Sequence, residues 1–501
     1  MISALVFLPA LAAILLLLVP RSQTMTLKAV ALTATLATFV LSLPFLGLVP
    51  GGIAQENFAW IGGPIAAAYH VRVDGLSLFF VLLTTLVSLP AVWAAFSYAD
   101  ATRMRGYLVL LLLFEWTLLG LFTAGDLLLF YIYWDLMLIP VFLALVGYAG
   151  TPQARRAAWI YLIYNLFGGL VLLAGVIGIV LKAHTFEVLG NSYPIDPVLG
   201  RWLFAAFALA FLIKTPAFPL HAWMPPTYTN SPPSLVALVS GVQSKAGLYG
   251  LLVFAIPLFP TAAQYFAPAM LVIAVISILY GALTAIAQTD AKTLVAYSSL
   301  SHLGFVLLAL FAFGFSSVSA SILMIVSHGV IAAALFLLLG FVQERVGTND
   351  LGAFGGLAAG APRLAALMLI VAMAALGLPG LSGFAGEFLI LIGAWQTQPV
   401  YTSLALIAVV LAAVYVLRLF QGAIHGPLRA PSDSRVGRAA LDHPNLVDLE
   451  RAPFDLRARE LALLVPLIAV IFFLGIWPAW LNDRVPIQLQ LDPVTTMSDR
   501  V

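Results

Sequence analysis

The sequence predicts an all-α protein that crosses a membrane about fourteen times. Of its 501 residues, 62% are hydrophobic and only 9% are charged, whereas about a quarter of an ordinary soluble domain is charged. The apolar stretches are long enough for helices that cross a hydrocarbon core of about 30 Å, which takes roughly 20 residues each. These stretches are continuous and lack the period-two alternation of a membrane β-barrel. A soluble domain, a disordered chain and a barrel are therefore excluded.

Charged and Pro/Gly-rich breaks divide the chain into the expected spans. The first has no basic residue before it and no small-residue cleavage pattern after it, so it is interpreted as a spanning helix, not a signal peptide. Residues 49–73 are expected to form a Gly-rich connecting loop. The polar loop 426–459 is either a solvated connector or a docking surface for a partner. The spans lie near 2–19, 26–48, 74–98, 106–124, 126–148, 157–182, 202–225, 233–258, 266–288, 292–313, 316–343, 363–395, 401–425 and 460–480.

The distribution of Lys and Arg predicts the orientation in the membrane. Fifteen of these residues fall in loops on one face of the predicted spans, and five fall on the other. Because basic loops stay in the cytoplasm, the first face is expected to be cytoplasmic and both termini outside. The net charge of +2 comes without a basic patch, so no nucleic-acid partner is expected. The absence of cysteine excludes disulfides, Fe–S clusters and thiolate metal sites.

Seven ionisable residues lie inside predicted spans. A charge at the bilayer centre costs roughly 2.5–3.5 kcal/mol, so such residues are expected to be functional. With a rise of about 1.5 Å per residue, six of them lie about 14 to 18 Å deep on six different helices. They would form a row parallel to the membrane surface, which suits proton relay sideways between half-channels. The seven are Glu115, Asp135, Lys214, Lys245, His302, His328 and Glu387.

Lys214 and Asp135 are expected to form a pair, because their charges are opposite and their depths are similar. A lysine buried in lipid needs a carboxylate partner or loses its proton. Lysine suits proton transfer because its ammonium can release a proton, whereas arginine stays charged. Lys245 is the next strongest candidate. A lone buried Glu or His often only packs and hydrogen-bonds, which leaves open a scaffold whose charges lock helices together.

Two predicted spans are interrupted next to a buried charge. Proline lacks a backbone donor and clashes with the preceding turn, so neither span can be one continuous helix. The freed carbonyls need protein or water, which places both breaks at a buried or water-lined site. The breaks lie five spans apart, which predicts two inverted repeats. The expected units are 1–105 with spans one to three, the repeats 106–258 and 259–425, and 426–501 with the last span. The breaks contain Pro216 and Pro219 after Lys214, and Pro379, Gly380 and Gly383 before Glu387.

Five stretches resemble the antiporter-like membrane subunits of respiratory complex I and the related Mrp cation/proton antiporters. The similarity extends over about 70–425. Within the family, the stretch that ends in Glu387 resembles the chain 4 type, bacterial subunit M. Other antiporter-like members usually have Lys at the position of Glu387. The stretches are VDGLS at 73–77, DLLLFYIYWDLMLIP at 126–140, IKTPAFPLHAWMP at 213–225, DAKTLVAYSSLSHLG at 290–304 and LPGLSGFAGE at 378–387.

The resemblance implies a place in a proton path for each of the seven residues. The family normally has Glu where this chain has Asp135, and Asp is one methylene shorter. The charge is kept, but the contact with Lys214 can lengthen. By resemblance, Asp135 pairs with Lys214, Glu115 biases that pair, Lys245 joins two half-channels, His302 and His328 are intermediate carriers, and Glu387 is the terminal group near the external exit.

The resemblance also implies a function, namely proton translocation by a subunit of a respiratory NADH–quinone oxidoreductase or a relative with another donor. The chain would lie in a bacterial inner membrane beside neighbouring antiporter-like subunits and lipid. NADH, FMN, Fe–S clusters and quinone are expected in partner subunits, and this chain, an enzyme only within the complex, is expected to hold no cofactor or metal. The alternative is an Mrp-type sodium/proton antiporter subunit, against which Glu387 in place of Lys argues.

Overall fold

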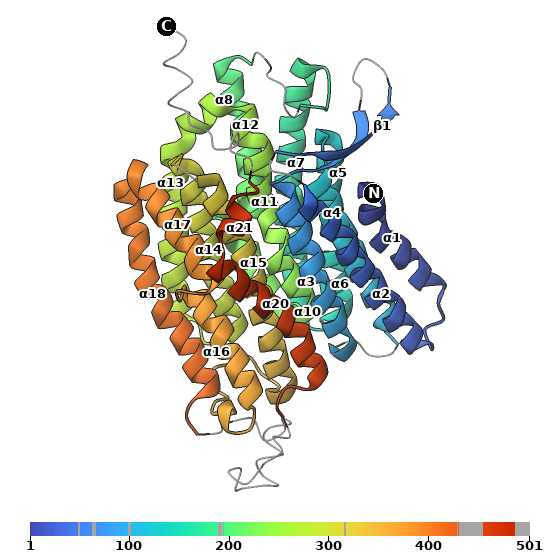
Figure 1. The fold of residues 1–501 in the computed structure, drawn as a ribbon, viewed down its shortest axis with the longest axis vertical. Coiled ribbons are helices and arrows are strands. Elements are labelled where there is room, and N and C mark those ends of the chain that lie inside the picture. The colour runs from blue at the N-terminus through green and yellow to red at the C-terminus, as the bar shows by residue number, and fades with distance from the viewer. Residues whose placement is uncertain are drawn as a thin grey trace.

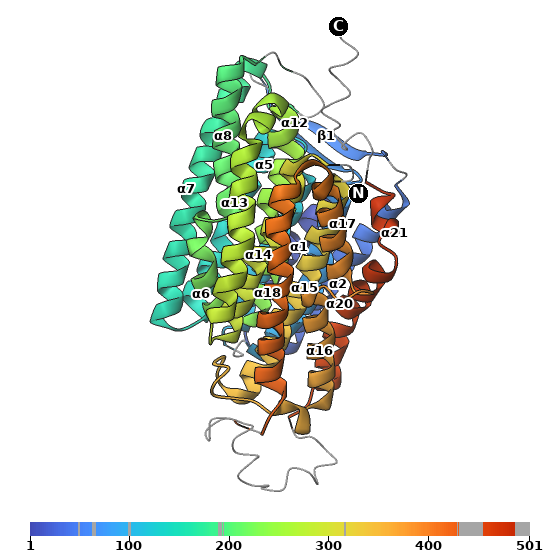
Figure 2. The same ribbon diagram turned by 90° about the vertical axis from the view of Figure 1, so that its left-hand side faces the viewer.

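The computed structural model describes residues 1–48, 51–62, 67–98, 102–188, 193, 195–314, 317–427, 429 and 454–485. Long helices run roughly parallel through the molecule, with a short sheet near one end (Figures 1 and 2). The helices of the first half are α1 (Ile2–Leu18), α2 (Thr24–Ser42), α3 (Ser77–Tyr98), α4 (Met104–Thr123), α5 (Leu127–Leu136), α6 (Leu138–Tyr148), α7 (Pro152–Ala183), α8 (Pro197–Lys214), α9 (Met224–Asn230), α10 (Pro233–Gly241), α11 (Ala246–Gly250) and α12 (Ile256–Leu258).

The second half continues the same architecture. Its helices are α13 (Pro260–Ala287), α14 (Ala291–Ala312), α15 (Ser317–Val346), α16 (Pro362–Leu376), α17 (Ser382–Thr397), α18 (Pro399–Ile424), α20 (Ala458–Ile476) and α21 (Ala479–Asn482). Within the described residues, twelve helical spans are long and apolar enough to cross a membrane, and α1 and α16 are shorter apolar helices. The all-α polytopic class is confirmed. Each expected span coincides with a helix or a run of helices, while the count of fourteen crossings and the inverted repeats stay predictions.

Burial differs sharply between central and peripheral helices. Side chains along α14 and α15 are almost all buried, whereas α2, α7 and α18 expose large apolar side chains such as Leu36, Ile163 and Val410. An apolar outer surface around a packed interior is what a membrane-embedded bundle requires, since lipid replaces water around it. Polar groups on the central helices are therefore removed from lipid.

The expectation that 49–73 forms only a connecting loop is wrong, because this segment contains a β-hairpin. β1 (Ala54–Ile61) pairs antiparallel with β2 (Ala67–Val73), from Ala54 opposite Val73 to Ala59 opposite Ala68. β1 contains the polar run Gln55–Asn57 and lies between Gly-rich segments, so the pattern resembles a loop.

Glu56 on β1 holds the first turn of α1. Its carboxylate accepts hydrogen bonds from the amides of Ile2 at 2.9 Å and Ser3 at 3.0 Å, and it contacts the Met1 ammonium. Partial burial acts to raise the pKa of Glu56, but these hydrogen bonds outweigh it and lower the pKa to about 2. The hairpin thus fixes the start of the first helix through a carboxylate that stays ionised.

A buried ion pair fastens α20 to the end of α15. Arg345 Nη2 lies 2.6 Å from Glu460 Oε2, and both side chains are at most 3% exposed. Arg345 also donates to the carbonyls of Phe454 and Asp455. Most of the polar loop expected at 426–459 lies outside the described residues, so its two interpretations stay predictions.

Candidate functional site

The first helix break lies directly after Lys214. α8 ends at Lys214, and the chain passes through 215–219 into a short turn, Leu220–Trp223, before α9 begins. The predicted interruption is therefore present. Trp223 Nε1 donates to the Ile213 carbonyl at 2.8 Å, so one backbone group at the end of α8 is satisfied by a side chain. Lys214 is buried, and the break holds its ammonium group inside the bundle.

The second break separates α16 from α17. α16 ends at Leu376, and α17 begins at Ser382. Gly377 and Gly380, on either side of Pro379, have left-handed backbone angles, with φ of +81° and +91°. Glycine enters this region without the steric cost that a Cβ imposes. The turn between the two helices therefore depends on both glycines, and the second predicted interruption is also present.

Glu387 lies near the start of α17 and packs back against this break. A Cβ placed on Gly377 would lie 3.0 Å from Glu387 Oε2. Gly383 allows another close approach, because a Cβ there would collide with the Ala374 carbonyl oxygen of α16. The two helix halves thus meet closely beside a buried carboxylate.

Asp135 and Lys214 lie close together but form no direct ion pair in this structure. Lys214 Nζ donates to the Trp134 carbonyl at 3.4 Å and lies 4.6 Å from the centre of the Trp134 ring. Although both residues are described, no nitrogen–oxygen distance of 4.0 Å or less joins Lys214 to Asp135. The carboxylate packs against α7 instead, since a Cβ on Gly169 would lie 2.8 Å from Asp135 Cγ. The direct contact expected from matching depths is absent because depth does not fix direction around a helix.

Lys245 lies in a 3-10 turn, Gln243–Lys245, inside a span expected to be one continuous helix. Val242, just after α10, leaves helical geometry with φ of −125° and ψ of −59°. The Lys245 ammonium contacts the Ser240 carbonyl and lies 3.1 Å from Ser244 Oγ. The sequence reading missed this irregularity because no proline marks it.

Polar side chains that the sequence reading did not single out lie around this turn. Gln243 Nε2 donates to the Tyr161 hydroxyl of α7 at 2.5 Å. The Tyr161 ring lies 5.5 Å from the Trp223 ring at the first break. The buried hydroxyl of Tyr228 on α9 lies near the serines of the segment 240–245 but has no hydrogen-bond partner among the described residues. The polar run SGVQSK at 240–245, inside an apolar span, was a signal that could have identified them.

Four helices bring His302, His328, Glu387 and Tyr415 together. His302 Nδ1 on α14 lies 2.9 Å from Glu387 Oε1 on α17. The His302 ring centre is 5.4 Å from that of His328 on α15, and the Tyr415 hydroxyl on α18 lies 3.5 Å from His302 Nε2. All four side chains are buried. The structure thus gathers three predicted residues into one chain of titratable groups and adds Tyr415, which the sequence reading missed.

Glu115 lies on α4, and its influence on the Asp135–Lys214 pair stays a prediction. The Tyr107 hydroxyl of α4 lies 2.7 Å from Ser234 Oγ of α10, and fifteen residues further along both segments Tyr249 donates to the Phe122 carbonyl. α4 therefore runs alongside the span that carries Lys245, and counting along both segments brings Glu115 level with residue 242. Its buried carboxylate lies beside a serine of α3, and no described contact joins it to the Asp135–Lys214 region.

A polar cavity of about 480 Å³ opens at the end of the bundle predicted to be cytoplasmic. Lys292, at the start of α14, lines it and donates to the Ser231 carbonyl at 3.3 Å. Ser231 follows α9, whose buried Tyr228 hydroxyl lies near the serines beside Lys245 without hydrogen-bonding to them. The cavity thus lies at one end of a row of polar side chains that leads toward Lys245.

A family model described as NADH:quinone oxidoreductase/Mrp antiporter, TM, matches residues 124–412. The chain belongs to this family. It is 33% identical to NADH-quinone oxidoreductase subunit M of Rhodobacter capsulatus, over 97% of this chain and 94% of that protein. It is 31% identical to NADH-ubiquinone oxidoreductase chain 4 of Marchantia polymorpha, over 95% of this chain and 94% of that protein.

Solved structures of this NADH:quinone oxidoreductase/Mrp antiporter family share the fold. A chain of respiratory complex I from Thermus thermophilus with bound NADH matches with a TM-score of 0.84 and 34% identity, covering 98% of this chain and all of that one. A chain of the Mrp complex from Dietzia sp. DQ12-45-1b matches with a TM-score of 0.85 and covers 99% of both chains. Its identity is only 22%, so it supports the fold alone.

Six of the seven predicted residues lie within the region that the family model matches, and Glu115 lies before it. Their contacts form two groups, one around Lys214 and one that includes His302 and Glu387. Within the described residues, no group of three or more His, Cys, Asp or Glu side chains gathers as a metal site would require.

Proposed function

We propose that this chain is the proton-translocating membrane subunit of a respiratory NADH–quinone oxidoreductase, of the subunit M type. The observation that carries the proposal is the set of buried ionisable groups at and between two helix breaks. Relatives more than 30% identical over nearly the whole chain carry the name of that subunit, which supports the choice of complex.

Protons enter at the polar cavity beside Lys292 and pass along Tyr228 and the serines of 240–245 to Lys245. From there they move to His328 and His302 and reach Glu387, which lies 2.9 Å from His302. Water bridges the remaining gaps, since polar cavities at helix breaks can hold it. Lysine is suited to the central position because it can both hold and release a proton.

Asp135 and Lys214 control the transfer. Two opposite unit charges about 4 Å apart attract by about 4 kcal/mol at an effective dielectric constant of about 20. Movement of the Asp135 carboxylate from Gly169 toward Lys214 therefore stabilises the ammonium form, and the return movement releases its proton. In the proposed cycle, the open position is the one in which Asp135 and Lys214 form no direct ion pair.

The complex supplies the energy for transfer, and this chain takes part in its catalysis only as a translocating subunit. NADH, FMN, Fe–S clusters and quinone belong to partner subunits, and other antiporter-like subunits lie beside this chain. We place the chain in the bacterial plasma membrane with both termini outside, and Glu387 near the external exit. The units 106–258 and 259–425 act as two inverted halves around Lys245.

The competing function is that of an Mrp-type sodium/proton antiporter subunit, which the fold of the Dietzia complex favours. Purification of the tagged chain with its native partners separates the two functions. Recovery of NADH-oxidising subunits supports the proposed complex, and recovery of antiporter subunits alone contradicts it.

Substitution of Lys214 or Glu387 by Ala tests the residues. Both variants are expected to assemble and to lose NADH-driven acidification of inverted vesicles. Unchanged pumping in both would refute the relay. A scaffold, in which the charges only hold helices together, predicts failed assembly instead.

A further inference from the structure

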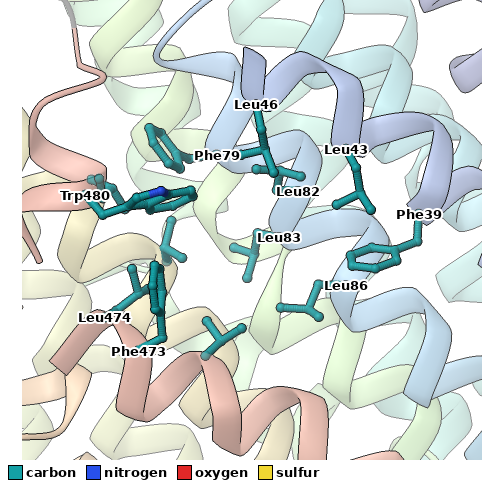
Figure 3. A pocket seen from close by; sticks show the side chains of 13 residues that line it. Phe39, Leu43, Leu46, Phe79, Leu82, Leu83, Leu86, Phe473, Leu474 and Trp480 are labelled. Carbon is teal, nitrogen blue, oxygen red and sulfur yellow. The ribbon is translucent and has the colours of Figure 1, made fainter. Parts of the chain in front are cut away.

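An apolar cavity that the proton path does not use lies between the first and last helices of the chain. It is bounded by α2 and the following turn Leu43–Gly47, by α3 and α15, and by α20 and α21. Figure 3 shows side chains from these elements facing a common space from opposite sides. The lining includes Phe39, Leu43, Leu82, Leu86, Phe473 and Trp480.

The cavity is suited to a hydrocarbon chain. It measures about 170 Å³ and presents almost no polar surface. An apolar cavity of roughly 150 Å³ stays dry and accepts small apolar molecules in preference to water. Leu43 and Phe473, on its two flanks, are each more than a third exposed, so the cavity opens toward the surroundings of the bundle. In a bilayer those surroundings are acyl chains.

A positive charge lies next to Trp480, a residue that lines the cavity. Arg484 follows α21, with its guanidinium carbon 4.6 Å from the centre of the Trp480 ring that lines the cavity. Its Nη1 donates to the Trp480 carbonyl at 2.8 Å, and its Nε is buried, whereas Nη2 of this half-buried side chain has no hydrogen-bond partner in the described part of the chain. A guanidinium with a free donor is a preferred partner for phosphate. Trp480 is also the residue type that favours the membrane–water interface.

We propose that this cavity is a binding site for an anionic phospholipid, with one acyl chain between α2, α3 and α20 and the phosphate at Arg484. The elements that line it come from the two ends of the sequence. The lipid would therefore join the N-terminal helices to α20 and α21 in the half of the membrane nearer the β-hairpin. This site is separate from the proton path and does not depend on it.

Photolabelling tests the proposal in the assembled complex. The complex is reconstituted with a phosphatidylglycerol that carries a diazirine on one acyl chain, and labelled peptides are identified by mass spectrometry. Leu82→Trp fills the cavity with an apolar side chain, while Leu406→Trp makes the same change on the exposed surface of α18. Arg484→Gln removes the phosphate partner and leaves the cavity intact.

We expect labelling of peptides from α3 and α20 at least about fivefold above that of other exposed helices. Leu82→Trp should reduce it to the level of those helices, and Leu406→Trp should leave it unchanged. Unlabelled phosphatidylglycerol should compete better than phosphatidylcholine in the wild type but not in Arg484→Gln. Uniform labelling of all exposed helices, labelling insensitive to Leu82→Trp, or equal competition by the two lipids in the wild type would overturn the proposal. Protection of the cavity by a neighbouring subunit would overturn it as well.

Discussion

Gly169 gives direct control over the position of the Asp135 carboxylate. A Cβ at Gly169 would collide with Asp135 Oδ1 and would lie 2.8 Å from Cγ, whereas ordinary contact begins at 3.4 Å. In Gly169→Ala the carboxylate must therefore rotate or retreat, and by more than the roughly 0.6 Å that Cγ alone requires, because Oδ1 lies nearer still. Overpacking of this kind costs about 1–3 kcal/mol, which is compatible with assembly of the protein.

The neighbouring Gly168 provides a matched control on the same helix. The three atoms nearest to a Cβ there belong to the Ile213 side chain and lie 3.4 Å or more away, so Gly168→Ala requires no movement. Misplacement of a functional group by about 1 Å can reduce a rate by up to 10²-fold. We expect Gly169→Ala to lower proton pumping about tenfold relative to Gly168→Ala.

The assay compares NADH oxidation with acidification of inverted membrane vesicles that carry equal amounts of the complex. If Gly169→Ala acts through the carboxylate, it should have no further effect in an Asp135→Asn background. Equal pumping by the two alanine variants would contradict the control role of Asp135. An equally large effect of Gly169→Ala in the Asp135→Asn background would also contradict the control role of Asp135.

Three further predictions concern other charged groups. Because the pKa of Glu56 is lowered to about 2 from an ordinary value of 4.5, its hold on α1 is complete above pH 4.5 and is lost as pH falls toward 2. Protection of the first α1 amides against hydrogen exchange, taken relative to the intrinsic exchange rate at each pH, should fall over this range in the wild type and should already be low at pH 7 in Glu56→Gln. Arg345→Met leaves the buried Glu460 unpaired and should destabilise the α20 attachment by about 3–5 kcal/mol, seen as faster proteolysis near residue 457, and wild-type resistance would contradict this. Glu115→Gln should lower proton pumping, and it should cause no further loss of pumping in a Lys245→Gln background. An additive loss in the double variant would show that Glu115 acts independently of Lys245.

Proline and buried charge made the two helix breaks predictable. Pro216 and Pro379 cannot continue a helix, and their positions after Lys214 and before Glu387 agree with the breaks that the structure contains. The irregularity before Lys245 was not predictable in the same way, because it arises in a proline-free segment where Ser240 and its neighbours offer alternative hydrogen bonds.

The depth of a residue along its helix can be estimated from the sequence, but the direction in which its side chain points around the helix axis cannot. Asp135 and Lys214 have matching depths, yet the short carboxylate faces Gly169. The contact of His302 with Glu387 depends on the turn at Gly377, which brings the start of α17 against α14. The β-hairpin was missed for a different reason, since β1 lies between glycines and lacks the regular alternation of apolar and polar residues that separates a strand from a loop.

The number of protons pumped per electron pair in Lys245 variants tests the relay most directly. Lys245→Arg keeps the positive charge but cannot release a proton, and Lys245→Gln removes both properties. If protons pass through Lys245, both variants should assemble, retain NADH oxidation in uncoupled vesicles and show a reduced ratio of protons to electrons. A wild-type ratio in Lys245→Arg would contradict proton transfer through this residue.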